Sequence, residues 1–235
     1  MDLDGIHVEA HGPDTGTPLV LVHGAPDRST SFRPLLAELG DRRVVVYDRR
    51  GYGRSLGAEP PTAMVDHAHD LLGVIERAGA PAVVVAHSFG SNLALLAATL
   101  RPEAFAALGV WEPPMVWIEQ WPQFTKDYNA RVAAAEDPAA TVEHFCRLVL
   151  GDAVWEAQSD EGRERYRAEG VAFQVDMGSA LTAPFACDDV RVPVLVGYGT
   201  DTFAFHDGGA IWLSETLPDG RLHVIEGTGH FAPRT

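Results

Sequence analysis

Short apolar runs recur along the chain, separated by longer stretches in which apolar residues recur at helical spacing. The runs at 19–22, 44–47 and 82–86 are almost continuously apolar, which is typical of parallel strands covered on both faces. Further strands are predicted at 6–10, 107–111, 192–196 and 222–225. Helices are predicted at 31–39, 65–78, 93–98 and 209–217. Alternating strands and helices imply a parallel α/β sheet with its ligand site beyond the carboxyl ends of the strands.

The stretch between residues 113 and 189 has a different pattern. Pro113 and Pro114 interrupt the alternation, and no strand is predicted before residue 190. Helical periodicity occurs at 124–135, 139–150 and 161–175. We therefore predict a core formed by residues 1–112 and 190–235, and a helical cap formed by residues 113–189.

Composition narrows the class of protein. The 235 residues suit one α/β domain, and 46% hydrophobic with 22% charged residues is ordinary for a globular chain. A net charge of −15 argues against a nucleic-acid or anionic-membrane partner. The N-terminus lacks the basic and apolar regions of a signal peptide, and no apolar run approaches the length of a bilayer span. Cys146 and Cys187 show no metal or redox spacing, so we expect a cytoplasmic protein.

The strongest candidate for chemistry is Ser88, which follows a β-branched strand and precedes an apolar helix. A sharp turn there forces an unfavourable backbone conformation on the serine, so Ala86 and Gly90, two residues away on either side, must be small. The hydroxyl then stands clear of the sheet, and the following helix directs free N–H groups to the same spot. We predict that Ser88 is a nucleophile; the alternative is a serine that merely caps the helix.

Three other turns directly follow predicted strands: His-Gly-Ala-Pro at 23–26, Asp-Arg-Arg-Gly-Tyr-Gly-Arg-Ser at 48–55 and Gly-Thr-Gly-His-Phe at 227–231. In this order, together with the turn at Ser88, they resemble the α/β-hydrolase family from about residue 5 to residue 231. The resemblance implies an α/β-hydrolase fold, a mostly parallel sheet flanked by helices, with the helical cap inserted after the sixth strand. Five residues follow His230. Relatives usually continue there into a helix that packs on the sheet. Without such a helix an apolar face of the sheet would be exposed, which favours a homo-oligomer.

A serine hydroxyl needs a base to take its proton. The resemblance implies that this base is His230, because His230 follows the last strand. Two carboxylates compete to orient His230. Asp201 follows strand 192–196, where most of the family has its acid. Glu112 ends the preceding strand, where haloalkane-dehalogenase-like relatives carry a glutamate. A glutamate buried at a strand end is costly, so its presence there indicates a specific role. We favour Glu112 and leave Asp201 open.

The resemblance also assigns the oxyanion hole to the backbone N–H groups of Ala25 and Phe89, since Pro26 has no N–H to donate. His87, beside the nucleophile, and Trp117, in the cap, are expected to line the substrate pocket. No metal or other cofactor is expected. His67 and His69 stand two apart on a predicted helix and so point to different sides.

These features together predict a serine hydrolase that cleaves a small-molecule ester, thioester or lactone of a small to medium apolar acid through an acyl-enzyme. Similar sites in the family perform C–C bond hydrolysis, perhydrolysis or cofactor-free dioxygenation, so these reactions remain alternatives. An alternative of another class is a non-catalytic binding protein with the α/β-hydrolase fold.

Overall fold

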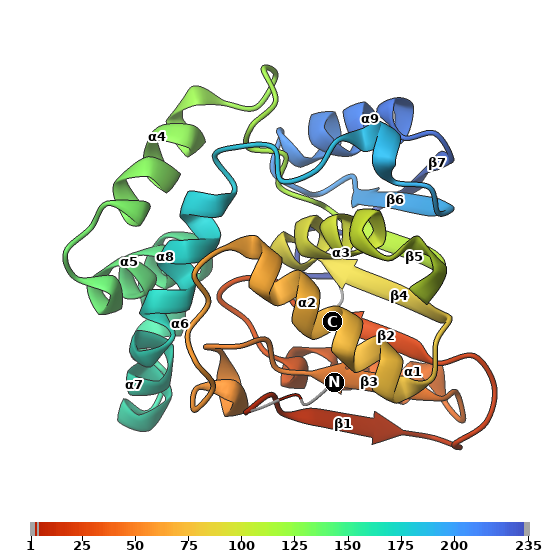
Figure 1. Ribbon diagram of the computed structural model, residues 1–235. Coiled ribbons are helices and arrows are strands. Elements are labelled where there is room, and N and C mark those ends of the chain that lie inside the picture. Colours follow the sequence, from red (N-terminus) through yellow and green to blue (C-terminus); the bar gives the residue numbers. More distant parts are fainter. Residues whose placement is uncertain (1–2, 4, 233–235) are drawn as a thin grey trace.

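The computed structural model describes residue 3 and residues 5–232, and its centre is a seven-stranded sheet (Figure 1). The strand order is β1-β3-β2-β4-β5-β6-β7; β1 pairs antiparallel with β3, and the other neighbours are parallel. The strands are β1 (Val8–His11), β2 (Leu19–Val22), β3 (Val44–Tyr47), β4 (Ala82–His87), β5 (Phe105–Trp111), β6 (Val194–Gly199) and β7 (Gly220–Ile225). The sequence predicted β2 and β3 to the residue, because continuous valine and leucine runs occur where a strand is covered on both faces.

Four helices flank the sheet: α1 (Arg33–Leu39), α2 (Met64–Ala78), α3 (Phe89–Leu100) and α9 (His206–Thr216). Helices α2, α3 and α9 share one hydrophobic core with the strands, whereas α1 packs near a smaller cluster that contains Leu21 and Val46. Near β6 and β7 the cover is incomplete, and four apolar side chains are exposed: Leu195, Leu222, Val224 and Ile225. No helix in the described part of the chain is long and apolar enough to cross a membrane.

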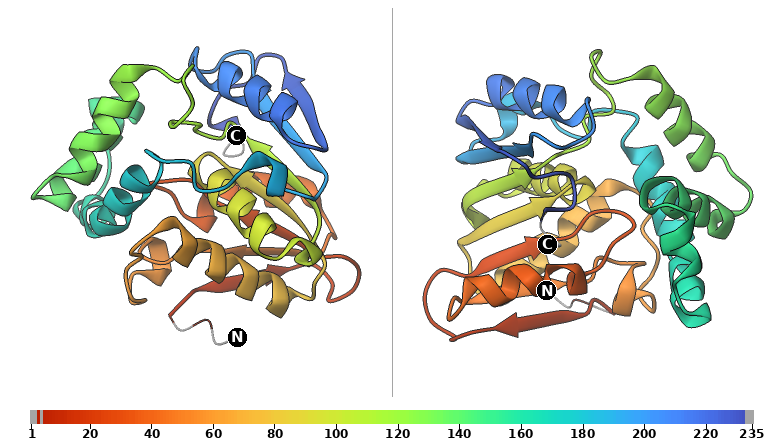
Figure 2. Two further views of the ribbon diagram at one scale, coloured as in Figure 1. Left: turned by 45° about the horizontal axis from the view of Figure 1, so that its top comes forward. Right: turned by 180° about the vertical axis from the view of Figure 1, so that it is seen from behind.

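Between β5 and β6 the chain forms five helices: α4 (Gln123–Ala133), α5 (Pro138–Leu150), α6 (Asp152–Glu156), α7 (Asp160–Ala168) and α8 (Gly170–Ser179). They lie beyond the carboxyl ends of the parallel strands, and the further views in Figure 2 show the same arrangement. This segment, which we call the cap, follows the fifth strand of the described chain. The prediction that the cap follows a sixth strand is therefore wrong. In the described residues one antiparallel strand, β1, and four parallel strands, β2 to β5, precede the cap.

The single helix predicted at 161–175 is in fact two helices, α7 and α8. The break falls at Glu169, and α8 begins at Gly170, where a Cβ atom would lie 2.4 Å from the backbone oxygen of Pro138 at the start of α5. Only a glycine allows the two backbones to approach so closely. The sequence periodicity continues through this point, so it could not reveal a break that is imposed by packing.

Two ion pairs with buried carboxylates join the cap to the core. Arg49 Nη2 donates to Asp176 Oδ2 at 2.8 Å, and both side chains are fully buried. Tyr52 also donates to Asp176, at 2.6 Å. Burial raises the pKa of Asp176, but the charges of Arg49 and His67 outweigh it and lower the pKa to about 2. A second bridge links Arg28 to Glu169 at 2.8 Å. The cap is therefore held at a fixed position over the strand ends.

Candidate active site

Ser88 lies in the turn between β4 and α3, with φ 53° and ψ −128°. This left-handed conformation is strained for a residue with a side chain. The turn is tight because the neighbouring backbone is close: a Cβ atom at Gly90 would lie 2.5 Å from the backbone oxygen of His23. The backbone N–H of Ser88 donates to Trp111 O at 2.8 Å. The turn thus projects the serine side chain above the carboxyl end of the sheet.

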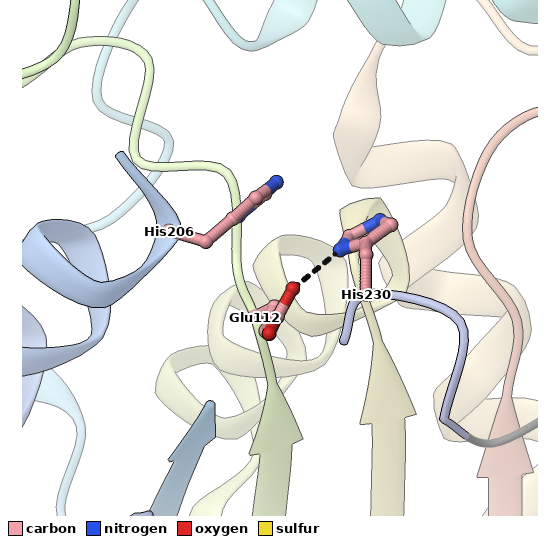
Figure 3. Close-up of side chains that lie close together, drawn as sticks. All are labelled: Glu112, His206 and His230. Atoms are coloured by element: carbon pink, nitrogen blue, oxygen red, sulfur yellow. Dashed lines mark hydrogen bonds and ion pairs between the residues drawn. The ribbon is translucent and has the colours of Figure 1, made fainter. Parts of the chain in front are cut away.

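His230 lies between Ser88 and Glu112. Its Nε2 atom is 3.2 Å from Ser88 Oγ, and its Nδ1 atom is 2.8 Å from Glu112 Oε2 (Figure 3). A carboxylate can only accept, so Nδ1 carries the hydrogen and Nε2 is free to accept the proton of the serine hydroxyl. This is the geometry that a serine nucleophile, its base and an orienting acid require.

Glu112 directly follows β5, is fully buried and has φ 48°. Its Oε1 accepts from the backbone N–H of Gly199 at 3.0 Å, and its Oε2 accepts from Thr202 Oγ1 at 2.6 Å. With His230, three donors therefore satisfy a carboxylate that would otherwise be costly to bury. The competing candidate, Asp201, is exposed, and its backbone N–H donates to Thr228 O. Of these two carboxylates, the structure brings Glu112 to His230.

The turn after β2 passes directly beside Ser88, since a Cβ atom at Gly24 would lie 3.0 Å from Ser88 Cβ. This brings Ala25, the next residue, to the cavity that Ser88 and Phe89 also line. Phe89 is the first residue of α3, and the first N–H groups of a helix have no intrahelical acceptor. The two expected oxyanion donors therefore lie on segments that meet at Ser88.

His23 and Arg49 fix the shape of this turn. His23 Nδ1 donates to Gly24 O and its Nε2 accepts from Arg49 N, both at 2.9 Å. Burial, with the nearby charge of Arg49, lowers the pKa of His23 to about 4, so the ring is neutral as this pairing requires. Arg49 Nη2 donates to Gly24 O at 2.8 Å as well as binding Asp176 of the cap. No sequence pattern indicated this role for Arg49, because only the fold shows that its side chain reaches the oxyanion turn.

Of the two residues expected to line the pocket, His87 does so and Trp117 does not. His87 lines the cavity, and its Nε2 donates to the backbone oxygen of His230 at 2.8 Å. Trp117 packs edge-on against Phe185 and is not among the described residues that line the cavity. Trp121, four residues later, takes that place. Helical or loop spacing alone could not decide which tryptophan of this segment faces the site.

The cavity above Ser88 has a volume of about 710 Å³ and lies between the core and the cap. Its lining is mostly apolar and aromatic, and the cap contributes Phe124, Tyr128, Phe145 and Tyr166. Such a cavity is suited to an apolar molecule of moderate size with a few polar groups near the reacting atoms.

A second histidine of the site, His206, was not predicted. Its side chain is buried, and its ring stacks on that of His230 with centroids 4.5 Å apart and planes inclined by 21°. It has no motif around it, so the sequence offered no signal for it. Within the described residues, Glu112, His206 and His230 form the one cluster with metal-ligand composition. A cation there would have to replace the existing hydrogen bond between Glu112 and His230. His67, by contrast, is buried against Asp176, and His69 is exposed.

The fold and this site define the class of protein: the chain belongs to the alpha/beta hydrolase family, whose sequence pattern matches residues 19–234. Over 244 residues it is 34% identical to the "Putative carbamate hydrolase RutD" of Caulobacter vibrioides (strain NA1000 / CB15N), covering 97% of this chain and 89% of the relative. An alpha/beta hydrolase from Sphaerobacter thermophilus DSM 20745 has a TM-score of 0.72 at 31% identity, over 95% of this chain and 89% of that one. A thermophilic esterase from Thermogutta terrifontis has a TM-score of 0.75 at 22% identity, over 97% and 87% of the two chains.

Proposed function

We propose that this α/β hydrolase cleaves an ester, thioester or lactone of a small to medium apolar acid through an acyl-enzyme on Ser88. The observation that carries the proposal is the hydrogen-bonded series Ser88–His230–Glu112 at the floor of an apolar cavity. The 3.2 Å separation of Ser88 Oγ and His230 Nε2 argues against a non-catalytic binding protein, for which we would expect these groups to lie beyond hydrogen-bond reach.

In the first half-reaction, Ser88 Oγ attacks the carbonyl carbon while its proton passes to His230 Nε2. The backbone N–H groups of Ala25 and Phe89 stabilise the negative charge that develops on the carbonyl oxygen. Glu112 stabilises the imidazolium. The bond to the leaving oxygen or sulfur then breaks, and that atom takes the proton from His230.

In the second half-reaction, water donates its proton to His230 and attacks the acyl carbon, and Ser88 Oγ leaves with the proton as the free acid forms. Protein groups and water supply every proton and nucleophile in this sequence. The apolar cavity favours an apolar substrate, and its moderate volume limits the combined size of the acyl and leaving groups.

Labelling with a fluorophosphonate probe tests the proposal, because such probes react with activated serines. We expect modification of Ser88, located by peptide mass, and none in Ser88→Ala. We also expect strongly reduced labelling in His230→Ala, where the base is lost. A wild-type protein that is folded by circular dichroism and is not labelled would contradict the proposal.

Carbamate hydrolysis is a second candidate, and the observation that favours it is the 34% identity to a relative with that name. The same groups would attack a carbamate carbonyl. Comparing matched ethyl esters and ethyl carbamates distinguishes the two, since a carbamate hydrolase would show the higher kcat/KM on the carbamate.

A further inference from the structure

His206 is the first residue of α9 and reaches the candidate active site from the side of β6. Its ring stacks on His230 and lines the cavity. In Figure 3 the rings of His206 and His230 both rise above Glu112, and the outermost ring atom of His206 is a nitrogen, which is therefore Nε2. We propose that His206 is a specificity residue that donates a hydrogen bond from Nε2 to an acceptor atom on the substrate's leaving group. This inference rests on the proposed function.

The two ring nitrogens of His206 have different surroundings. Nδ1 is buried and has no hydrogen-bond partner among the described residues. Nε2 points away from Glu112, and His206 is one of the residues that line the cavity. Buried N–H groups without a partner are rarer than buried acceptors without one, so the hydrogen of a neutral ring belongs on Nε2.

The ring is neutral because its surroundings disfavour a charge. Burial lowers the pKa of His206 well below its ordinary value, and positive charge on His230 or His87 would lower it further. A neutral His206 with hydrogen on Nε2 presents one donor, and no positive charge, to whatever occupies the cavity.

The leaving group is the part of the substrate that lies closest to this donor. The carbonyl oxygen is directed at the backbone of Ala25 and Phe89, whereas the leaving atom must contact His230 Nε2 to receive its proton. A group that begins at His230 extends along the ring stacked on it, which is the ring of His206.

The chemistry around His206 indicates the kind of leaving group. The rings of Trp121, Phe205 and Phe203 surround it, with centroids 5.4, 5.0 and 6.1 Å from that of His206. A single donor in an aromatic setting fits an apolar alcohol that carries one accepting oxygen a few atoms from the scissile bond. An isosteric hydrocarbon would leave the donor unpaired in surroundings where that is costly.

Two butyrate esters that differ in one atom test this inference: 2-methoxyethyl butyrate has an ether oxygen where n-butyl butyrate has a methylene. The ratio of kcat/KM for the two esters is divided by the ratio of their rate constants for alkaline hydrolysis. This correction removes the difference in intrinsic reactivity. For the wild-type enzyme we expect a corrected preference of about fivefold for the methoxyethyl ester, as one neutral hydrogen bond provides.

His206→Phe keeps an aromatic ring against His230 and removes the donor, so we expect the corrected preference to fall to about one while the butyl ester is still cleaved. His206→Gln retains an N–H donor and should restore part of the preference. A preference that persists in His206→Phe, an equal loss on both esters, or no preference in the wild type would overturn the inference. Ser88→Ala separates this outcome from failure of the proposed function. If the wild type cleaves the butyl ester and Ser88→Ala does not, the proposed function holds even when the preference is absent.

Discussion

At the residue scale, the decisive feature is the set of donors that hold Glu112. Gly199 is the last residue of β6 and Thr202 lies in the loop that follows, and both donate to the carboxylate that follows β5. The loop in which the sequence pattern offered Asp201 as the acid thus contributes donors to Glu112 instead. Fully buried and fixed at both oxygens, Glu112 keeps the ring of His230 in one orientation.

We predict that Glu112→Gln lowers kcat by about 10³- to 10⁴-fold, because the amide NH₂ group favours the His230 tautomer that cannot accept the serine proton. Asp201→Asn is the matched control, since it makes the same chemical change on an exposed side chain, and we expect its kcat within about twofold of wild type. Steady-state kinetics on an ester cleaved by the wild type measure both. Equal losses in the two variants would contradict the assignment of Glu112.

The sequence predicted Ser88 and His230 as candidates because each stands in a recognisable turn after a strand. It could not choose between Glu112 and Asp201, because adjacent strands β5 and β6 end at the same edge of the sheet. The choice depends on a backbone with φ 48° at Glu112 and on the position of Thr202, which no local pattern encodes. His206 was missed for the same reason: only the approach of α9 to the sheet brings it to His230.

At the scale of elements, the turn between β4 and α3 depends on close packing against the end of β2. Gly90 lies in α3 and yet faces backbone rather than side chains: its Cβ position would be 2.5 Å from His23 O and 2.8 Å from Val22 O. The nucleophile turn and the oxyanion turn are therefore packed directly against each other, and a change in one displaces the other.

We predict that Gly90→Ala lowers the free energy of unfolding by about 1–3 kcal/mol and reduces kcat, because the added methyl group forces the two turns apart. Gly208→Ala in α9 is the control, since no atom outside the adjoining helix backbone lies within 4 Å of its Cβ position and alanine favours a helix. Urea denaturation of both variants gives the measurement. A Gly90→Ala protein as stable and active as wild type would show that the turns are not coupled in this way.

At the scale of the whole molecule, the sequence was sufficient for the α/β-hydrolase fold and the family, because strand runs and turn motifs in a fixed order are specific together. The sequence did not predict the contacts between the cap and the core. Arg28 and Arg49 stand far from Glu169 and Asp176 in the chain, yet each pair forms a salt bridge whose carboxylate is fully buried. Such pairs become visible only once the cap is placed over the strand ends. Burial raises the pKa of both carboxyl groups, but the neighbouring charges outweigh burial at Asp176 and do not at Glu169.

Burial raises the pKa of Glu169 from 4.5 to about 7, although Arg28 and the backbone N–H of Gly53 act in the other direction. The folded protein therefore holds a proton on Glu169 that the unfolded chain releases above pH 4.5. Its contribution to stability is full below that pH and is lost as the pH rises through about 7. For Asp176, whose pKa is lowered to about 2, the contribution is present above 3.8 and is lost only in acid. Between pH 5 and 8, Glu169 alone of these two carboxylates changes its contribution.

We predict that the wild-type free energy of unfolding falls by about 2–3 kcal/mol more than that of Glu169→Gln between pH 5 and pH 8, because glutamine cannot ionise. Urea denaturation at intervals of one pH unit measures the difference and cancels the histidines common to both proteins. Asp176→Asn is the control: it leaves Arg49 buried without its charge partner and should lower stability by about 3–5 kcal/mol. Its pH dependence over this range should differ from that of the wild type only through His67, whose pKa is lowered by burial and raised by the charge of Asp176. Parallel curves for wild type and Glu169→Gln would mean that Glu169 is ionised in the folded protein throughout, with Arg28 outweighing the cost of burial.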